Sequence, residues 1–331
     1  IMTPWSFVHV TDIHLGSPRS FRYAPAWVEN WRTACGQIQD LRPDLLLVGG
    51  DVTRDGSIHP YELTQARVEL DRLPFPYHVV PGNMDIGNKH AKVVGGHTNA
   101  AVTFGGYDGS AGKTTQHDRE DTIRDDISCN LRSEELAQWC AVFGPPWWSY
   151  DHKGVRFSGI CDILLNSGLS EEKQLWSWLE TQAGRPRAAH HVWLVHYPLF
   201  ADRPDEPSWD LRDLKQYHNW YFTIDQPGRG RLLEILKATG ATIVLSGHVH
   251  CRKLHVADGI RFHLGPSTAF AQWTARWPDG DPTAGFQLCE VTDGGIQCRF
   301  VPLGKISQTK GYGSGGHIPP DKRDYSLAWE R

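Results

Sequence analysis

The stretch that decides the fold is LLLVGGDVTRDG, residues 45–56. Four consecutive apolar residues closed by two glycines are typical of a strand buried on both faces, as in a parallel sheet. Outward from it, residues 25–41 and 60–73 show helical spacing, and residues 5–10 and 77–80 form further short apolar runs. This β-α-β-α-β succession predicts an α/β fold with right-handed crossovers and a largely parallel sheet.

The rest of the chain continues the alternation less regularly. We expect helices over 133–143, from 170 onward with Ser170 as N-cap, and over 231–239. Strands are expected over 155–161, 192–195 and 242–245, followed by short strands to about residue 301. A single domain over 1–303 is predicted, with an insertion at about 86–130, a polar pocket-wall loop at about 201–230 and a tail over 304–331.

Composition excludes several classes of protein. The chain has 331 residues, a formal net charge of −4, 40% hydrophobic residues and 22% charged residues, which is ordinary globular usage. A nucleic-acid partner is not expected, because binding to the phosphate backbone needs a strongly basic face and the net charge here is −4. No run of 18 apolar residues exists, which predicts no membrane span. The first residues lack a charged and then apolar leader, so a cytoplasmic location is expected.

Seven cysteines, an odd number without a CxxC pair, favour a reducing compartment over a disulfide framework. The dipeptide Asp293-Gly294 predicts a two-residue hairpin turn that places Cys289 opposite Cys298. We expect these two thiols to be free, packed as small apolar residues, in preference to a bridge.

Polar residues follow the predicted strands directly, at the edge where α/β sheets bind ligands. They are Asp12 and His14, Asp51, Asn83 and Asp85, His196, and His248 and His250. Each motif alone is weak, but five in this order predict a convergence of oxygen and imidazole ligands. Such a set without thiolate suits Mn, Fe, Zn or Co better than a structural zinc site.

These motifs resemble those of the calcineurin-like metallophosphoesterase superfamily, and especially its bacterial branch of class III cyclic-nucleotide phosphodiesterases and glycerophosphodiesterases. The resemblance implies a four-layer α/β/β/α sandwich of two mostly parallel or mixed sheets flanked by helices, with two metal ions. One ion would be held by Asp12, His14 and His250, the other by Asn83, His196 and His248, and Asp51 would bridge both.

The ligand types explain the implied chemistry. Two cations that share one hydroxide can direct it at phosphorus while holding the phosphoryl group. Asp51 would set their spacing, and Asn83 supplies oxygen without negative charge, which keeps the site cationic. Asp85 is either an orienting residue behind the ligands or an ordinary turn aspartate. Asp55 is expected to serve in a turn.

The sequence departs from the family at Met84, where a His usually follows the Asn. Methionine cannot protonate a leaving oxygen, and a diester carries less charge than a monoester dianion, so a phosphodiesterase is favoured. A substitute for that imidazole could come from His97, His117, Arg54 or Arg252, although each is more simply explained as a solvated loop residue.

The leading hypothesis is therefore a phosphodiesterase acting on a small-molecule phosphoester. The alternatives are a phosphomonoesterase on the same site and, from another class, a non-catalytic binding scaffold; homo-oligomerisation stays open. The 201–230 segment carries Trp209, Tyr217, His218, Trp220 and Tyr221, which could stack a nucleobase or simply pin the loop. Asn166 is expected to be structural, and His190 and His191 are expected to precede their strand without binding metal.

Overall fold

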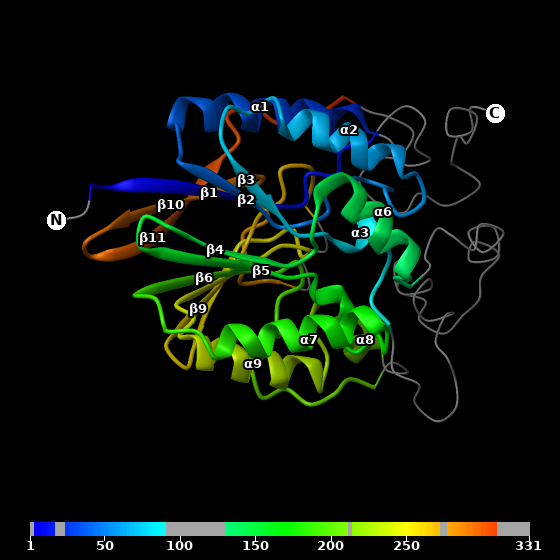
Figure 1. Ribbon diagram of the computed structural model, residues 1–331. Helices are drawn as coiled ribbons and strands as arrows, with labels where there is room; N and C mark the ends of the chain where they lie inside the picture. The colour runs from blue at the N-terminus through cyan, green and yellow to red at the C-terminus, as the bar shows by residue number, and fades with distance from the viewer. Residues whose placement is uncertain (1–2, 17–23, 91–129, 211–213, 272–276, 310–331) are drawn as a thin grey trace, which may run out of the picture.

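Two β-sheets packed face to face, with helices on both outer sides, form the core of the computed structural model (Figure 1). The structure describes residues 3–16, 24–90, 130–210, 214–271 and 277–309. The predicted α/β/β/α arrangement is confirmed. Most of the expected insertion, including His97 and His117, lies outside the described residues, as does the tail from residue 310.

The first sheet has the order β11-β10-β1-β2-β3. Its strands are β1 (Trp5–Val10), β2 (Leu45–Val48), β3 (Tyr77–Val79), β10 (Gly285–Thr292) and β11 (Gly295–Pro302). β1, β2 and β3 run parallel, as the β-α-β-α-β pattern predicts, and β10 joins β1 antiparallel. The carboxyl ends of β1, β2 and β3 therefore meet at one edge.

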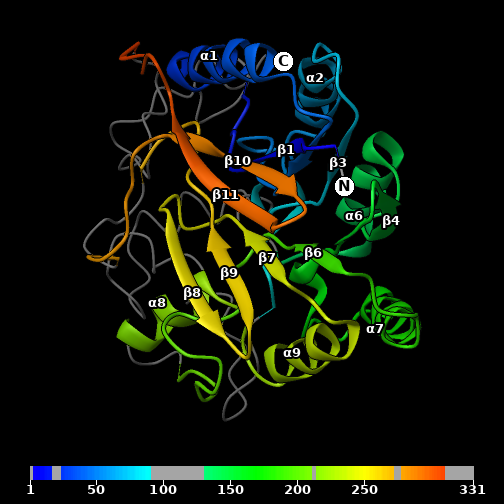
Figure 2. The ribbon, with the colours of Figure 1, turned by 90° about the vertical axis from the view of Figure 1, so that its left-hand side faces the viewer.

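The second sheet has the order β4-β5-β6-β7-β9-β8 (Figure 2). Its strands are β4 (Trp148–His152), β5 (Val155–Gly159), β6 (His190–Leu194), β7 (Ile243–Ser246), β8 (Lys253–Ala257) and β9 (Ile260–Leu264). β5, β6, β7 and β9 run parallel. His190 and His191 lie inside β6 and do not precede it, and the His191 ring contacts the Ser158 hydroxyl at 2.9 Å.

Alternation along the strands builds two apolar layers. Phe7 and Leu45 of the first sheet share a buried cluster with Phe157 and Val192 of the second. Val8 and Leu46, one position further on, face the opposite way and join the larger cluster that includes residues of the outer helices. Because both faces of β1 and β2 are buried, their sequences are nearly continuous apolar runs.

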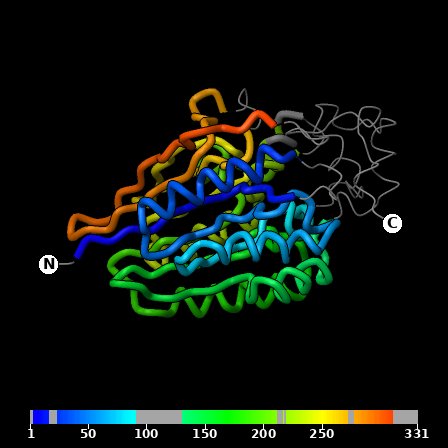
Figure 3. Tube along the Cα trace, turned by 90° about the horizontal axis from the view of Figure 1, so that it is seen from above, coloured from blue at the N-terminus to red at the C-terminus, as the bar shows by residue number. Residues whose placement is uncertain are grey.

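Helices cover both outer faces. α1 (Pro25–Leu41) and α2 (Tyr61–Leu70) lie side by side over the first sheet (Figure 3), with α6 (Ser133–Phe143) beside α2. α7 (Ser170–Ala183) packs against α9 (Gly228–Thr239) on the far side of the second sheet. Shorter helices are α3 (Asn83–Ile86), the 3-10 turn η1 (Asp162–Leu164) and α8 (Leu214–Phe222).

Two further predictions about local structure were wrong. Ser170 is the first residue of α7 rather than its N-cap, which is Leu169; the Ser170 hydroxyl bonds to the Glu171 carboxylate. The predicted loop over 201–230 contains α8 and the start of α9. Tertiary packing decides α8, because Trp220, Tyr221 and Phe222 at its end are buried against β-sheet loops.

The β10–β11 hairpin has the predicted register, with Cys289 opposite Cys298 and a turn at Asp293-Gly294. The two residues form a disulfide, contrary to the expectation of free thiols. The hairpin brings their Cα atoms to 4.0 Å, so the register itself supplies the proximity. Within the described part of the chain, no helix combines the length and apolar character needed to cross a membrane.

Candidate metal centre

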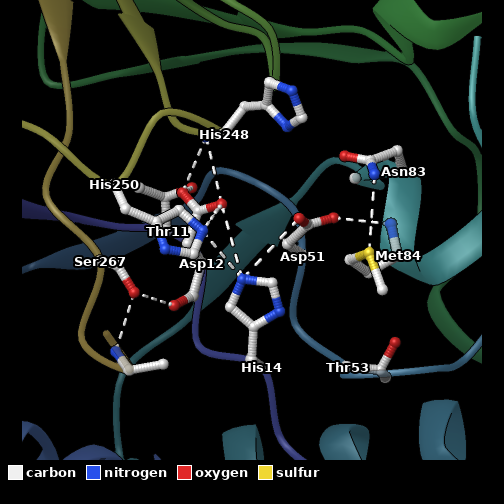
Figure 4. A network of polar contacts seen from close by, with 12 residues as sticks. Thr11, Asp12, His14, Asp51, Thr53, Asn83, Met84, His248, His250 and Ser267 are labelled. Carbon is white, nitrogen blue, oxygen red and sulfur yellow. Dashed lines mark hydrogen bonds and ion pairs between the residues drawn. The ribbon is translucent and has the colours of Figure 1, made fainter. Parts of the chain in front are cut away.

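All seven predicted metal ligands come from loops at the carboxyl ends of parallel strands, and the structure brings them together. Asp12 and His14 follow β1, Asp51 follows β2, and Asn83 opens α3 after β3. His196 follows β6, while His248 and His250 follow β7. All seven side chains are buried, none more than 3% exposed. In Figure 4, Asp12, His14 and Asp51 face one another, with Asn83 beyond Asp51.

The backbone of these loops is held in a conformation that few side chains favour. Asp12, His14, Asp51, His248 and His250 all have positive φ angles, between 47° and 68°. Each such residue is strained unless it is glycine. Gly82 is required by close approach, since a Cβ there would lie 2.2 Å from the Asp51 backbone nitrogen. The chain therefore turns sharply to bring these side chains together.

The buried ligand atoms form two groups that share one residue. Asp12, His14, Asp51 and His250 make the first group, and Asp51, His196 and His248 make the second. Asp51 divides its oxygens between them: Oδ2 lies 3.8 Å from His14 Nε2, and Oδ1 lies 3.4 Å from His196 Nε2. This is the arrangement expected of a carboxylate that bridges two cations.

Asn83 joins the second group through its amide oxygen. Its Oδ1 lies 3.1 Å from His196 Nε2, while its Nδ2 donates to Asn88 Oδ1 at 3.1 Å. In this orientation the amide oxygen, and not the amide nitrogen, faces the centre. Asn83 can thus present an uncharged oxygen ligand, as its position in the sequence predicts.

The hydrogen bonds made by the ring nitrogens that point away from the centre show whether this site fits metal ions. His196 Nδ1 contacts the Gly49 carbonyl oxygen at 2.8 Å, and His250 Nδ1 contacts that of Phe270 at 2.8 Å. A carbonyl oxygen only accepts, so each Nδ1 carries a proton and each Nε2 faces the centre. In His196 the Nε2 atom meets the oxygens of Asn83 and Asp51, so positive charge must lie between them, either a metal ion or, when none is bound, a second ring proton.

The electrostatics of the centre agree with this requirement. Burial opposes protonation of His196, yet the charge of the nearby Asp51 carboxylate outweighs it and raises its pKa to about 10. Burial likewise opposes ionisation of Asp12, but His250 beside it lowers the Asp12 pKa. The buried carboxylates thus stabilise positive charge, and a mixed oxygen and imidazole set fits Mn, Fe, Zn or Co.

Asp85 fills both roles that the sequence left open. It accepts the backbone N–H of Gly82 at 2.8 Å, which caps α3, and that of Thr53 at 2.9 Å, together with the Thr53 hydroxyl. Burial and the nearby Asp51 charge raise its pKa to about 7. It holds the loops that carry Asp51 and Asn83 and is not itself in either ligand group.

Asp162 is a supporting residue that the sequence analysis missed. Its carboxylate accepts the backbone N–H groups of His196 and Tyr197, at 2.7 Å and 2.8 Å. Asp12 does the same for His248, whose N–H lies 2.9 Å from Oδ2. The signal was present, because Asp162 follows a predicted strand just as Asp12 and Asp51 do.

Met84 lies beside the centre, as its place in the motif predicts. Its backbone N–H donates to Asp51 Oδ1 at 2.8 Å, and its sulfur lies 3.6 Å from Asn83 Nδ2. Among the proposed substitutes for the missing imidazole, Arg252 pairs with Asp281. Arg54 is buried, with its guanidinium carbon 5.2 Å from the centre of the Trp27 ring, so the expectation of a solvated residue was wrong.

The other residues considered have structural contacts. Asn166 bonds through its amide to the backbone of Asp225 and Gly228, as expected of a structural residue. The backbone carbonyl of Asp55 accepts N–H groups of Ile58 and His59, which is turn geometry. Tyr221 and Phe222 surround the His248 ring, at 5.1 Å and 5.6 Å between ring centres. The side chains of Tyr217 and His218 lie outside the described residues.

Comparison with solved structures agrees with the fold. The chain superposes on purple acid phosphatase PPD1 of yellow lupin with a TM-score of 0.55 at 12% identity, covering 94% of this chain and 53% of that one. It superposes on GAP50 of Plasmodium, described as the anchor in the inner membrane complex, with a TM-score of 0.51 at 13% identity, covering 92% and 86%.

Sequence relatives carry two different activities in their names. A serine/threonine-protein phosphatase CPPED1 of Danio rerio is 25% identical over 186 residues, 53% of each chain. A probable cyclic nucleotide phosphodiesterase of Pseudoalteromonas sp. is 36% identical over 78 residues, 23% of this chain and 30% of that one. The chain spans about half or less of the length of these curated relatives. The model of the calcineurin-like phosphoesterase family matches residues 6–252, and the chain therefore belongs to that family.

Proposed function

We propose that this protein is a binuclear metal-dependent phosphodiesterase that hydrolyses a small-molecule phosphodiester. The observation that carries the proposal is Asp51, whose two oxygens face two different groups of buried ligands. When bound, two metal ions activate water for attack on phosphorus and withdraw charge from the phosphoryl group. The family and the named relatives support phosphoric ester hydrolysis.

The chain's own residues supply the positioning. Asp51 sets the spacing of the two ligand groups, and Asn83 completes the second group without adding charge. His196 and His250 donate hydrogen bonds from Nδ1 to backbone carbonyl oxygens, and this orients their Nε2 atoms toward the centre. Asp85 and Asp162 hold the loops through backbone N–H groups. The site can thus bind an anionic phosphoryl group with little reorganisation.

Met84 supports the preference for diesters. Its thioether lies next to Asn83, in the position where the family motif usually has an imidazole. An uncharged side chain there offers no extra cation to a monoester dianion and no proton to a leaving oxygen. A phosphomonoesterase is the second candidate, because one relative is named a phosphatase.

The test combines metal analysis with turnover of two model substrates. The purified protein is expected to bind about two metal ions per chain and, with added Mn²⁺, to hydrolyse bis-p-nitrophenyl phosphate faster than p-nitrophenyl phosphate. Met84→His should shift the preference toward the monoester, and Met84→Leu, of similar volume, should not. A monoester preference in the unchanged protein would support the second candidate, and absence of both metal and turnover would support a binding scaffold.

A further inference from the structure

Lys89 is a buried lysine, 6% exposed, that none of the motifs explains. It follows α3 closely in sequence, near the loop that carries Asn83. Its ammonium group donates to the backbone carbonyl oxygens of Trp220, Tyr221 and Thr223 at the C-terminal end of α8. It also lies 4.4 Å from the centre of the Tyr197 ring and 4.6 Å from that of Trp220. Lys89 therefore connects the segment after α3 with the end of α8 and with Tyr197 in the loop after β6.

One of those carbonyl groups is shared with a candidate metal ligand. His248 Nε2 lies 3.0 Å from the Tyr221 carbonyl oxygen, and Lys89 Nζ lies 3.4 Å from the same atom. A carbonyl only accepts, so the His248 proton is on Nε2, and Nδ1 is the ring nitrogen that remains to bind a metal ion. The Tyr221 carbonyl thus decides the tautomer of His248.

The position of that carbonyl depends on a donor for the end of α8. The last carbonyl groups of a helix have no partners within the helix and need donors from elsewhere. A lysine at a helix C-terminus supplies donors and also interacts favourably with the helix dipole. Because the end of α8 is buried, loss of the ammonium group would remove a donor from three of its carbonyl groups at once, which should displace the helix end.

We propose that Lys89 is a positioning residue for the second metal site, which it acts on by fixing the carbonyl that orients His248. The effect should fall mainly on the second site, because Lys89 shares the Tyr221 carbonyl with the His248 ring, whereas the first group meets His248 through its backbone N–H, which Asp12 accepts. The inference rests on the proposed function, since it concerns one of the two metal sites of that enzyme.

The experiment measures Mn²⁺ binding to the metal-free protein by titration calorimetry. His14→Ala removes a ligand of the first site and His196→Ala one of the second, so each leaves one site to be measured. Lys89→Met, which keeps the aliphatic stem, is introduced into both. In the His14→Ala protein it should weaken Mn²⁺ binding at least about tenfold, the usual effect of removing a residue behind a ligand. In the His196→Ala protein the change should be much smaller.

Two further variants complete the design. Lys89→Arg keeps charge and donors and should restore most of the lost affinity. Lys153→Met removes an exposed lysine paired with Asp44 and should have no effect. Circular dichroism checks folding; if Lys89→Met does not fold, Lys89→Gln is titrated in its place and judged by the same criteria.

The outcomes separate this inference from the function on which it rests. If the unchanged protein binds two ions and Lys89→Met alters neither site, or alters both equally, the inference is overturned and the proposed function stands. If the unchanged protein binds fewer than two ions, the proposed function fails and the inference fails with it. Selective weakening of the site that His14→Ala leaves intact supports both.

Discussion

The Nε2 atoms of His14 and His250 lie 3.0 Å apart, although the two residues are 236 positions apart in the sequence. His250 donates a hydrogen bond from Nδ1 to the Phe270 carbonyl oxygen, so in the neutral ring its Nε2 carries a lone pair. The pair is therefore held together either by a proton on His14 or by a shared cation. The close approach of two residues so distant in sequence shows that the fold, rather than local sequence, assembles the centre.

Asp51→Asn is expected to weaken both metal sites, because its two oxygens face different ligand groups. Affinity for each ion should fall by at least about a hundredfold, more than removal of a residue behind a ligand produces. Titration of the metal-free protein with Mn²⁺ measures both sites. Asp151→Asn, which removes a half-exposed carboxylate paired with Arg156, is the control. Selective loss of one ion would contradict the bridging role.

Asp85→Ala is expected to destabilise the fold as well as the site. The substitution leaves the buried N–H groups of Gly82 and Thr53, and the Thr53 hydroxyl, without their acceptor. Each unsatisfied group costs about 1–3 kcal/mol, so the free energy of unfolding should fall by at least about 3 kcal/mol. Urea unfolding of the metal-free protein measures this change without a contribution from bound ions. A loss below about 1 kcal/mol would show that water replaces the carboxylate.

Acid should destabilise the protein through His9. This histidine is fully buried, and burial lowers its pKa from 6.5 to about 4. The folded protein therefore resists a protonation that the unfolded chain accepts, so stability is complete above pH 6.5 and is lost as pH falls toward 4. Between pH 7 and pH 5 the loss due to His9 should be about 2 kcal/mol. Urea unfolding of His9→Asn should show a pH dependence smaller by that amount, and an unchanged dependence would contradict the assignment.

The disulfide should contribute measurably to stability. Cys289 and Cys298 are separated by 9 positions, and closing so short a loop stabilises a protein by about 2.5 kcal/mol through the unfolded chain. Cys298→Ser should lower the free energy of unfolding by that amount without reductant. Dithiothreitol should bring the unchanged protein to the same value. A midpoint that does not respond to dithiothreitol would mean that the thiols are free in solution.

The sequence predicts the strands and the convergence of the site for a physical reason. Short apolar runs bounded by glycine define β1 and β2, and parallel strands necessarily bring the residues after them, Asp12 and Asp51, to one edge. The end of α8 could not be predicted in this way, because its helix is stabilised by burial of Trp220 and Phe222 against distant loops. Lys89 was missed for the same reason, since its partners are backbone carbonyls that carry no sequence signature.

Cys289 and Cys298 show a second kind of limit. Turn chemistry predicts that they face each other, and the register confirms it. Whether two facing thiols are joined depends on redox chemistry, which no hydrophobic pattern encodes. Composition favoured free thiols, and the structure has the bridge.

The left-handed backbone at Asp12, His14, Asp51, His248 and His250 has a consequence for evolution and engineering. Glycine relieves such strain at each position, so a search for thermostability alone would remove these side chains one by one. His14→Gly should accordingly be more stable than His14→Ala while both lose the ligand. A lineage that kept only the scaffold would drift toward glycine here. Retention of Asp and His at these five positions instead indicates selection for the metal centre that they form.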